Sequence, residues 1–354
     1  MFPKCGNYVT IIYPLKILNK GILIIVLISG CLQTKDQKVQ SYLLKGNQAL
    51  ASKEYQDAVE YFELVLKADN GNTDALNNLG IAYSGLNNQI EAIKQYSLAL
   101  TIDSLHYDSR YNRFNAYYSH NKFTDALTDL SILKKVYPDS AQVSFAFGLA
   151  YTKLKNYSKA KQSFDLALEQ GWDEVEILIN KGNLSFYQGD LNAAKNDILL
   201  ALKLDSLQGL AYNSLALITI EENESIEALP LIDKALWLDP GHPYYLNNKG
   251  YILLKMGKFD EAEIFINESI TTDPSNAWAF RNKGIVHLNK GNVIRAIELL
   301  EHAIEIDMHV DDAYYYLAKA YFINGQIDLA CISLSKAMEL DSQKLIKIEG
   351  LICQ

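Results

Sequence analysis

Five asparagines recur at multiples of one interval in this 354-residue chain, and their side chains suit hydrogen bonding to a peptide. Consecutive members lie 34 or 68 residues apart: Asn78, Asn112, Asn180, Asn248 and Asn282. A carboxamide both donates and accepts hydrogen bonds, so it can pair with a peptide unit whatever side chain that unit carries. Recurrence at a fixed interval predicts a ladder of such groups along one face of a repetitive structure.

Aromatic residues accompany the asparagines at neighbouring positions of the same interval. Their rings offer apolar area with a polar edge, which suits contact with an extended chain. The candidate contacts are Tyr111, Tyr118, Tyr244, Tyr251, Trp278 and Tyr315. With the asparagines they make up the predicted peptide-binding set.

Catalytic chemistry has no comparable signal in the sequence. The histidines are scattered: His106, His120, His242, His287, His302 and His309. No H-x-x-x-H, C-x-x-C or H-E-x-x-H spacing occurs, and there is no G-x-S-x-G elbow, P-loop or dinucleotide fingerprint. We therefore expect no enzymatic activity, no metal, no cofactor and no small-molecule substrate. A net charge of −9 without a basic stripe argues against nucleic acid as a partner.

The interval that positions these residues is a 34-residue unit of two amphipathic helices. In the unit 243–276, Gly250 and Ala262 stand where two helices can cross closely only if neither side chain is bulky. Gly257 is placed to end the first helix as a left-handed cap, and Asp273-Pro274 closes the second. One such hairpin cannot bury its own apolar face, so copies must stack.

Nine copies of this unit run from residue 39 to residue 344 without insertion or deletion. They are 39–72, 73–106, 107–140, 141–174, 175–208, 209–242, 243–276, 277–310 and 311–344. Alanine occupies position 20 in all nine, a small residue occupies position 8 in eight, and Gly or Asn occupies position 15 in seven. The pattern predicts an all-α solenoid, whose core grows with each added repeat.

The unit resembles the tetratricopeptide repeat (TPR), which places small residues at positions 8 and 20 and proline at 32. The resemblance implies a right-handed α-solenoid whose first helices line a concave groove, with positions 2, 5, 6 and 9 facing it. The five asparagines stand at position 6. This arrangement is similar to the asparagine ladder in the repeats of O-linked N-acetylglucosamine transferase, which grips an extended peptide by its backbone.

Two observations limit that resemblance. Asparagine is common at position 6 of TPRs. The ordinary composition of the repeat therefore explains its recurrence here as well as a peptide-binding ladder does. The carboxylate clamp of chaperone-binding TPRs is missing, because position 5 is Asn77, Tyr111 or Phe145 where that clamp would need lysine.

Residues 1–30 lie outside the repeats and are typical of an export signal. Lysines without acidic residues flank an apolar run at 22–28, and small residues follow it. The sequence Leu27-Ile28-Ser29-Gly30-Cys31 resembles the bacterial lipoprotein box, which implies cleavage before Cys31 and acylation of that cysteine. A membrane-spanning anchor is disfavoured because such a span needs roughly 20 apolar residues. An ordinary cleaved signal with an incidental cysteine is the other alternative.

Residues 31–38 would then be the lipidated cysteine and a polar tether. Removal of residues 1–30 would lower the formal net charge from −9 to −12, so acyl chains rather than charge must hold the protein at the membrane. Cys331 and Cys353 would remain near the C-terminal tail, 345–354. They could pair in an oxidising periplasm or stay as two thiols.

These features together predict a lipid-anchored scaffold of the bacterial cell envelope, at the outer membrane, that binds protein or extended peptide partners in its groove. Resemblance to TPR lipoproteins implies a role in envelope assembly or maintenance. The alternative is a structural lipoprotein that associates with copies of itself through its apolar C-terminal end.

Overall fold

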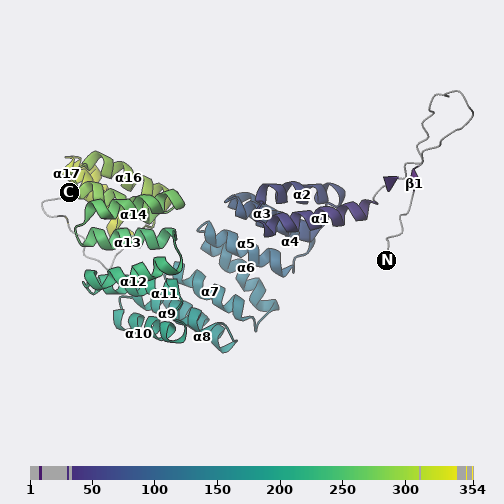
Figure 1. The fold of residues 1–354 in the computed structure, drawn as a ribbon, viewed down its shortest axis with the longest axis horizontal. Coiled ribbons are helices and arrows are strands. Elements are labelled where there is room, and N and C mark those ends of the chain that lie inside the picture. Colours follow the sequence, from purple (N-terminus) through teal and green to yellow (C-terminus); the bar gives the residue numbers. More distant parts are fainter. Residues whose placement is uncertain are drawn as a thin grey trace, which may run out of the picture. The chain divides into compact units, whose positions relative to one another are not determined.

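The computed structural model describes residues 8–9, 30–31, 34–310, 312–340, 348 and 353, which are almost entirely helical (Figure 1). The helices of this described part are α1 (Lys35–Ala51), α2 (Tyr55–Ala68), α3 (Thr73–Gly85), α4 (Gln89–Ile102), α5 (Tyr107–Ser119), α6 (Phe123–Val136), α7 (Ala141–Lys153), α8 (Tyr157–Glu169), α9 (Glu174–Tyr187), α10 (Leu191–Leu204), α11 (Gly209–Glu221), α12 (Ser225–Leu238), α13 (Pro243–Lys255), α14 (Phe259–Thr272), α15 (Ala277–Asn289), α16 (Val293–Ile306), α17 (Ala313–Ile323) and α18 (Ile327–Leu340).

Two short strands precede the helices. β1 (Tyr8–Val9) pairs antiparallel with β2 (Gly30–Cys31), and Tyr8 lies opposite Cys31. The rest of the predicted signal, 1–30, lies outside the described residues. The same holds for the predicted tail, 345–354, apart from residues 348 and 353.

The helices alternate between a first and a second helix of each repeat, and the second helices keep strict phase. Each second helix begins 34 residues after the one before it, from Tyr55 in α2 to Ile327 in α18. The expected all-α fold of tandem helical hairpins is therefore confirmed.

The turn inside each hairpin accounts for the residues found at position 15. The backbone there is left-handed in all nine repeats, with φ of +76° at Gly257 and +59° at Asn87. A left-handed residue lets the chain leave the first helix while capping its last carbonyl groups, and glycine and asparagine adopt it at little cost. Lys53 and Lys155 adopt it too, with φ of +60° and +55°, so the hairpin geometry overrides their own preference.

The close crossing predicted for each hairpin is also confirmed. A Cβ atom added to Gly250 would lie 3.1 Å from the carbonyl oxygen of Ala262 and 2.5 Å from Cγ1 of Ile266. The alanine at position 20 is completely buried in all nine repeats. In the third repeat the bulky Phe114 replaces the small residue, and it packs in a buried cluster with Leu133.

The first helix begins earlier than the predicted repeat boundary at residue 39. The Gln37 N–H donates to Oγ1 of Thr34 at 3.2 Å, and the Thr34 N–H donates to Oε1 of Gln37 at 3.0 Å. This capping box satisfies two free N–H groups and starts α1 at Lys35. The predicted tether, 31–38, is therefore helical from Lys35 onward.

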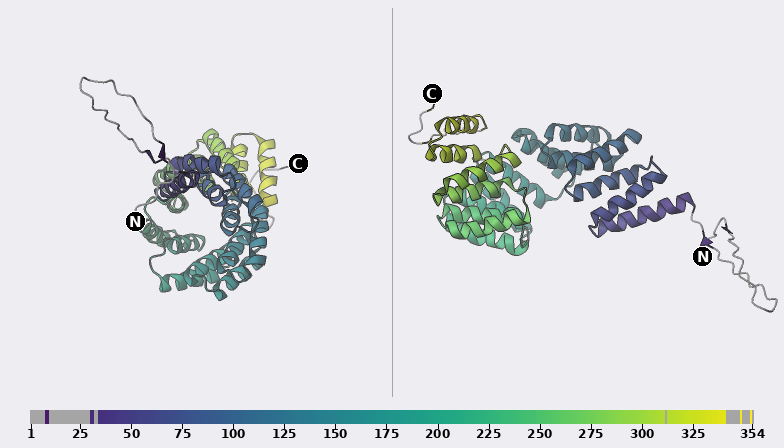
Figure 2. Two further views of the ribbon diagram at one scale, coloured as in Figure 1. Left: turned by 90° about the vertical axis from the view of Figure 1, so that its right-hand side faces the viewer. Right: turned by 90° about the horizontal axis from the view of Figure 1, so that it is seen from above.

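The chain forms two compact units, Met1–Ser163 and Phe164–Gln354. In both units each hairpin stacks on the next in chain order, as the colour sequence in Figure 2 shows. First helices of neighbouring repeats also contact each other directly: α1 with α3, α3 with α5, α9 with α11, α11 with α13, α13 with α15 and α15 with α17. We call the surface formed by the first helices of a unit its inner face.

Candidate peptide-binding face

The inner face of the second unit carries a continuous relay of side-chain hydrogen bonds. Nδ2 of Asn248 donates to Oδ1 of Asn213 at 2.8 Å, and Nδ2 of Asn247 donates to Oδ1 of Asn248 at 3.3 Å. Nδ2 of Asn282 donates to Oδ1 of Asn247 at 2.8 Å. Nε and Nη2 of Arg281 both donate to Oδ1 of Asn282, at 3.2 and 2.9 Å. One chain of hydrogen bonds thus joins α11, α13 and α15.

The first unit repeats this arrangement with other residues. Nδ2 of Asn112 donates to Oδ1 of Asn77 at 3.0 Å, and Oγ of Ser109 donates to the same oxygen at 3.3 Å. Nδ2 of Asn77 donates to Oδ1 of Asn78 at 3.1 Å, and Nδ2 of Asn78 donates to Oδ1 of Asn47 at 2.9 Å. The relay therefore joins α1, α3 and α5.

The stacking of the repeats sets the geometry of both relays. Three asparagines at position 6, Asn112, Asn248 and Asn282, reach back to position 5 of the preceding repeat, 35 residues earlier in the chain. Asn78 instead reaches Asn47, at position 9 of the preceding repeat. Asparagine also occupies position 5 in three repeats, outside the predicted peptide-binding set: Asn77, Asn213 and Asn247. Asn77 and Asn247 were visible in the Asn-Asn pairs at 77–78 and 247–248, whereas Asn213 is followed by Ser214 and gave no such signal. The position-6 asparagines therefore bond to one another's neighbours instead of standing as separate open rungs.

Asn282 and Asn180 differ most from the expected ladder. Asn282 is completely buried, so its side chain is not open to a partner in the way that a groove-facing ladder requires. Asn180 donates from Nδ2 to the carbonyl oxygen of Glu176 in its own helix, at 2.9 Å. Asn180 has no asparagine to reach because position 5 of the preceding repeat is Phe145. The relay cannot continue toward the next repeat either, because Ile179 and Ser214 occupy the two positions that would link them.

Two of the predicted aromatic contacts pair on the second unit, where Tyr244 is exposed and Trp278 is half-buried. Tyr244 in α13 and Trp278 in α15 lie edge to face, with ring centroids 6.4 Å apart. The Tyr244 side chain is 45% exposed. Its partial burial and the nearby Asp273 carboxylate raise the pKa of its hydroxyl, so it stays a neutral donor and acceptor. Tyr315 lies farther along, with its ring 5.2 Å from that of Tyr316.

Tyr111 and Tyr118 of the first unit are packed against their own repeat. Both rings lie against Phe114, at centroid distances of 5.4 and 6.0 Å. Tyr107 stacks on Tyr111 at 5.9 Å, and Phe123 lies 5.5 Å from Tyr118. The bulky residue at position 8 is thus accommodated by an aromatic stack, which leaves Tyr111 and Tyr118 only partly exposed.

Tyr251 is flanked by two cations on the inner face of the second unit. Nζ of Lys255 lies 5.3 Å from the ring centroid, and Cζ of Arg281 lies 5.7 Å from it. Burial alone would lower the pKa of Lys255, but Tyr251, Tyr316 and Glu221 raise it overall. The aromatic ring faces both cations in the manner of a cation–π contact.

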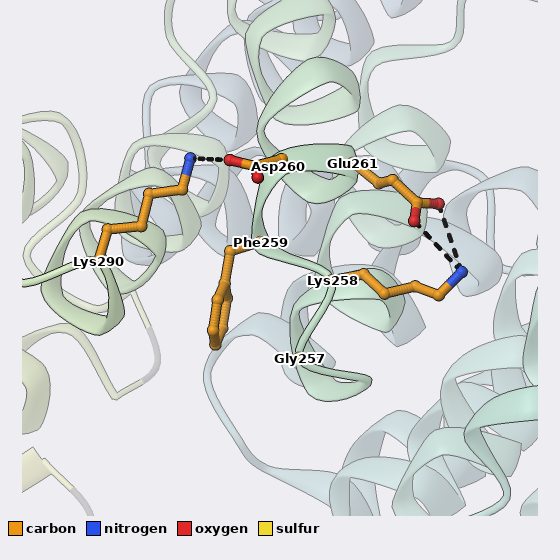
Figure 3. Close-up of a pocket in the computed structure, with 6 residues that line it drawn as sticks. All are labelled: Gly257, Lys258, Phe259, Asp260, Glu261 and Lys290. Carbon is orange, nitrogen blue, oxygen red and sulfur yellow. Dashed lines mark hydrogen bonds and ion pairs between the residues drawn. The ribbon is translucent and has the colours of Figure 1, made fainter.

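A shallow cavity of about 450 Å³ lies at the turn between α13 and α14 (Figure 3). Its walls include Gly257, Phe259 and four charged side chains: Lys258, Asp260, Glu261 and Lys290. Nζ of Lys290 lies 2.6 Å from Oδ1 of Asp260, and Nζ of Lys258 lies 3.3 Å from Oε1 of Glu261. Because these charges already pair with one another, the cavity offers a ligand little unsatisfied polarity.

Comparison with known protein families identifies the family to which this chain belongs. Two descriptions of the tetratricopeptide repeat match the chain, one at residues 43–106 and 111–175, the other at 175–206, 243–276 and 311–344. Together they cover more than half of its length. The chain belongs to the tetratricopeptide repeat family.

Individual relatives share the TPR fold at low sequence identity. A tetratricopeptide repeat protein from Parabacteroides merdae superposes with a TM-score of 0.64 at 18% identity, over 71% of this chain and 99% of that one. The APC/C hetero-tetramer Cut9–Hcn1 gives a TM-score of 0.57 at 15% identity, over 89% and 65%. Human protein O-mannosyl-transferase TMTC3 is 24% identical over 213 residues, which cover 56% of this chain and 23% of that protein. This TPR chain therefore spans about a quarter of that curated relative.

Within the described residues, no group of histidine, cysteine and carboxylate side chains is arranged to hold a metal ion. Nor is any helix of this described part both long and apolar enough to cross a membrane. Lipidation of Cys31 stays a prediction, because only the backbone pairing of that residue is described.

Proposed function

We propose that this TPR protein is a scaffold that binds protein or extended peptide partners on its inner face. The observation that carries the proposal is the pairing of an amide relay with the exposed Tyr244 ring and the half-buried Trp278 ring on the second unit. Amide groups meet the hydrogen-bonding needs of a peptide backbone, and Tyr244 and Trp278 supply apolar area beside them. The proposal includes no catalytic step, cofactor, nucleic acid or small-molecule substrate, and it assigns the transferase activity named for TMTC3 to that protein alone.

Photo-crosslinking tests where a partner binds. A photoreactive phenylalanine analogue at Tyr244 samples the inner face, and the same analogue at Trp237 of α12 samples an outer helix where the side chain is 67% exposed. Both are exposed aromatic positions of one unit, so substitution should be tolerated equally. We expect at least tenfold more partner adduct from position 244. Equal yields from both positions would move the binding surface away from the inner face.

We further propose that the protein is held in the bacterial cell envelope, at the outer membrane, by lipid on Cys31. The lipoprotein-like sequence that ends at Cys31 supports this location. The disulfide between Cys331 and Cys353 also supports it, since such bonds persist in oxidising compartments.

Replacing Cys31 with Ala is expected to abolish incorporation of labelled palmitate and to leave an uncleaved precursor. The reason is that both processing and acylation of a lipoprotein act at this thiol. Metabolic labelling followed by gel analysis measures both effects, with Cys353→Ala as the matched control. Equal labelling of wild type and Cys31→Ala would show that the lipid anchor is assigned wrongly.

Self-association is a second candidate function, favoured by one feature of the second unit. Each of its last four second helices carries one strongly exposed isoleucine at position 18 or 22: Ile226, Ile264, Ile294 and Ile332. Exposed apolar side chains that recur on successive helices are typical of a contact surface. Light scattering on residues 32–354 distinguishes the two functions, because only self-association gives a dimer that depends on concentration.

A further inference from the structure

The sense of the relay in the second unit is fixed by Arg281. An asparagine side chain alone can present either its oxygen or its nitrogen to a neighbour, but a guanidinium only donates. Oδ1 of Asn282 must therefore face Arg281, which leaves Nδ2 of Asn282 to donate to Asn247. The same constraint passes to Asn248 and then to Asn213. Both links between repeats donate toward the N-terminal end of the unit, from Asn282 to Asn247 and from Asn248 to Asn213.

The relay ends at Asn213 with its amide nitrogen unused. Oδ1 of Asn213 accepts from Asn248, and Nδ2 donates to no group in the described part of the chain. The side chain is only 6% exposed. However, among the described side chains the only completely buried nitrogen or oxygen without a partner is Nδ1 of His242. Nδ2 of Asn213 must therefore reach the surface of the inner face.

A donor in this position is stronger than an isolated carboxamide. Hydrogen bonds in a chain polarise one another, and here a cation lies at the donating end of the chain. The polarisation leaves the two Nδ2 hydrogens of Asn213 in need of an acceptor, while the burial of the side chain holds them in one direction.

We propose that Asn213 is a binding residue that donates to a main-chain carbonyl oxygen of an extended segment on the inner face, with Arg281 as its positioning residue. This inference rests on the proposed peptide-binding function and adds the acceptor and the contact point. A neutral carbonyl is the acceptor that recurs along any extended chain. It therefore suits a scaffold that binds the main chain of its partner whatever side chains the partner carries.

The relay of the first unit offers a useful contrast. It ends at Asn47, whose side chain is exposed, and begins at Ser109, whose hydroxyl can donate or accept. No donor-only residue fixes its sense in the way that Arg281 does. The directed donor is therefore a property of the second unit.

Side-chain amide resonances of protein labelled with 15N-asparagine test the inference. N,N-dimethylacetamide serves as a probe because it has a carbonyl acceptor and no N–H group, and acetate serves as the carboxylate alternative. We expect dimethylacetamide to shift the Asn213 amide signals in a saturable manner and to leave those of the buried Asn247 in place. The Asn213 signals are assigned by their absence from Asn213→Ala.

Two variants complete the test at pH 8. Asn213→Asp keeps the acceptor for Asn248 but removes both hydrogens, and its inner face should bind dimethylacetamide at least tenfold more weakly, measured by the signals of Asn248. Asn267→Asp adds the same charge at an exposed site on α14 and should bind as wild type does. Glutamine can both donate and accept, so Arg281→Gln no longer fixes the direction of the hydrogen bonds in the relay. The shift that dimethylacetamide causes in the Asn213 amide signals should therefore fall at least twofold, an effect that a change in stability alone would not produce.

Three results would overturn the inference: unmoved Asn213 signals in folded wild type, a response to acetate alone, or equal binding by Asn213→Asp. The probes are small molecules, so these results are independent of the crosslinking result. Crosslinking at Tyr244 with no response of Asn213 would retain the scaffold function and reject this contact.

Discussion

Replacing Asp129 with alanine is expected to lower the free energy of unfolding of the first unit by about 3–5 kcal/mol. The Asp129 carboxylate is 1% exposed and pairs with two arginines. Nη1 of Arg110 lies 3.0 Å from Oδ1, and Nε of Arg113 donates to Oδ2 at 2.8 Å. The hydrogen bond to Asp129 raises the pKa of Arg113. Arginine side chains are not deprotonated in proteins, so both guanidinium groups would stay charged without their counter-ion. Unpaired buried cations are the source of the large cost.

Hydrogen exchange of α5 and α6 measures this loss. Tryptophan fluorescence does not, because Trp172, Trp237 and Trp278 all belong to the second unit. Asp165→Ala is the matched control: Asp165 pairs with Lys181 at 2.6 Å, but both side chains are partly exposed, so its loss should cost less than about 1 kcal/mol. If the two variants lost the same stability, burial of the Asp129 pair would not be the cause.

The fold was predictable because each repeat position imposes its own local requirement. A bulky side chain cannot fit at the helix crossing, so alanine recurs at position 20 and is completely buried. A left-handed residue must end the first helix, so glycine or asparagine dominates position 15. Lys53 and Lys155 break that composition rule but adopt the same conformation. The 34-residue period therefore predicted the fold correctly in spite of these two exceptions.

The candidate site was only partly predictable, because its contacts join positions in different repeats. Position 6 could be recognised from its spacing, but its hydrogen-bond partner at position 5 depends on how one hairpin stacks on the next. Asn282 shows the consequence, since the same residue type at the same position is completely buried there and half-buried at Asn248. The direction of the relay depends on a single residue, Arg281, which no periodic pattern indicates.

Breaking the bond between Cys331 and Cys353 is expected to destabilise the C-terminal hairpin by about 3 kcal/mol. Their sulfur atoms are bonded, with Cα atoms 5.5 Å apart, and the bond closes a loop of sequence separation 22. Opening it returns loop entropy to the unfolded chain. In the described part of the chain, α17 and α18 pack on one other repeat, through α15 and α16, so the loss should appear as fraying of α17 and α18 instead of global unfolding.

Hydrogen exchange of α17 and α18, with and without reductant, measures this loss in residues 32–354, where Cys331 and Cys353 are the only cysteines. Cys331→Ser and Cys353→Ser should each reproduce the effect of reductant, and the double variant should add nothing, because all three changes remove one bond. The Asp129→Ala variant provides the converse control, since it should leave exchange in α17 and α18 unchanged. Two free thiols in the unreduced, denatured protein, or exchange that does not respond to reductant, would contradict a stabilising disulfide at this end of the chain.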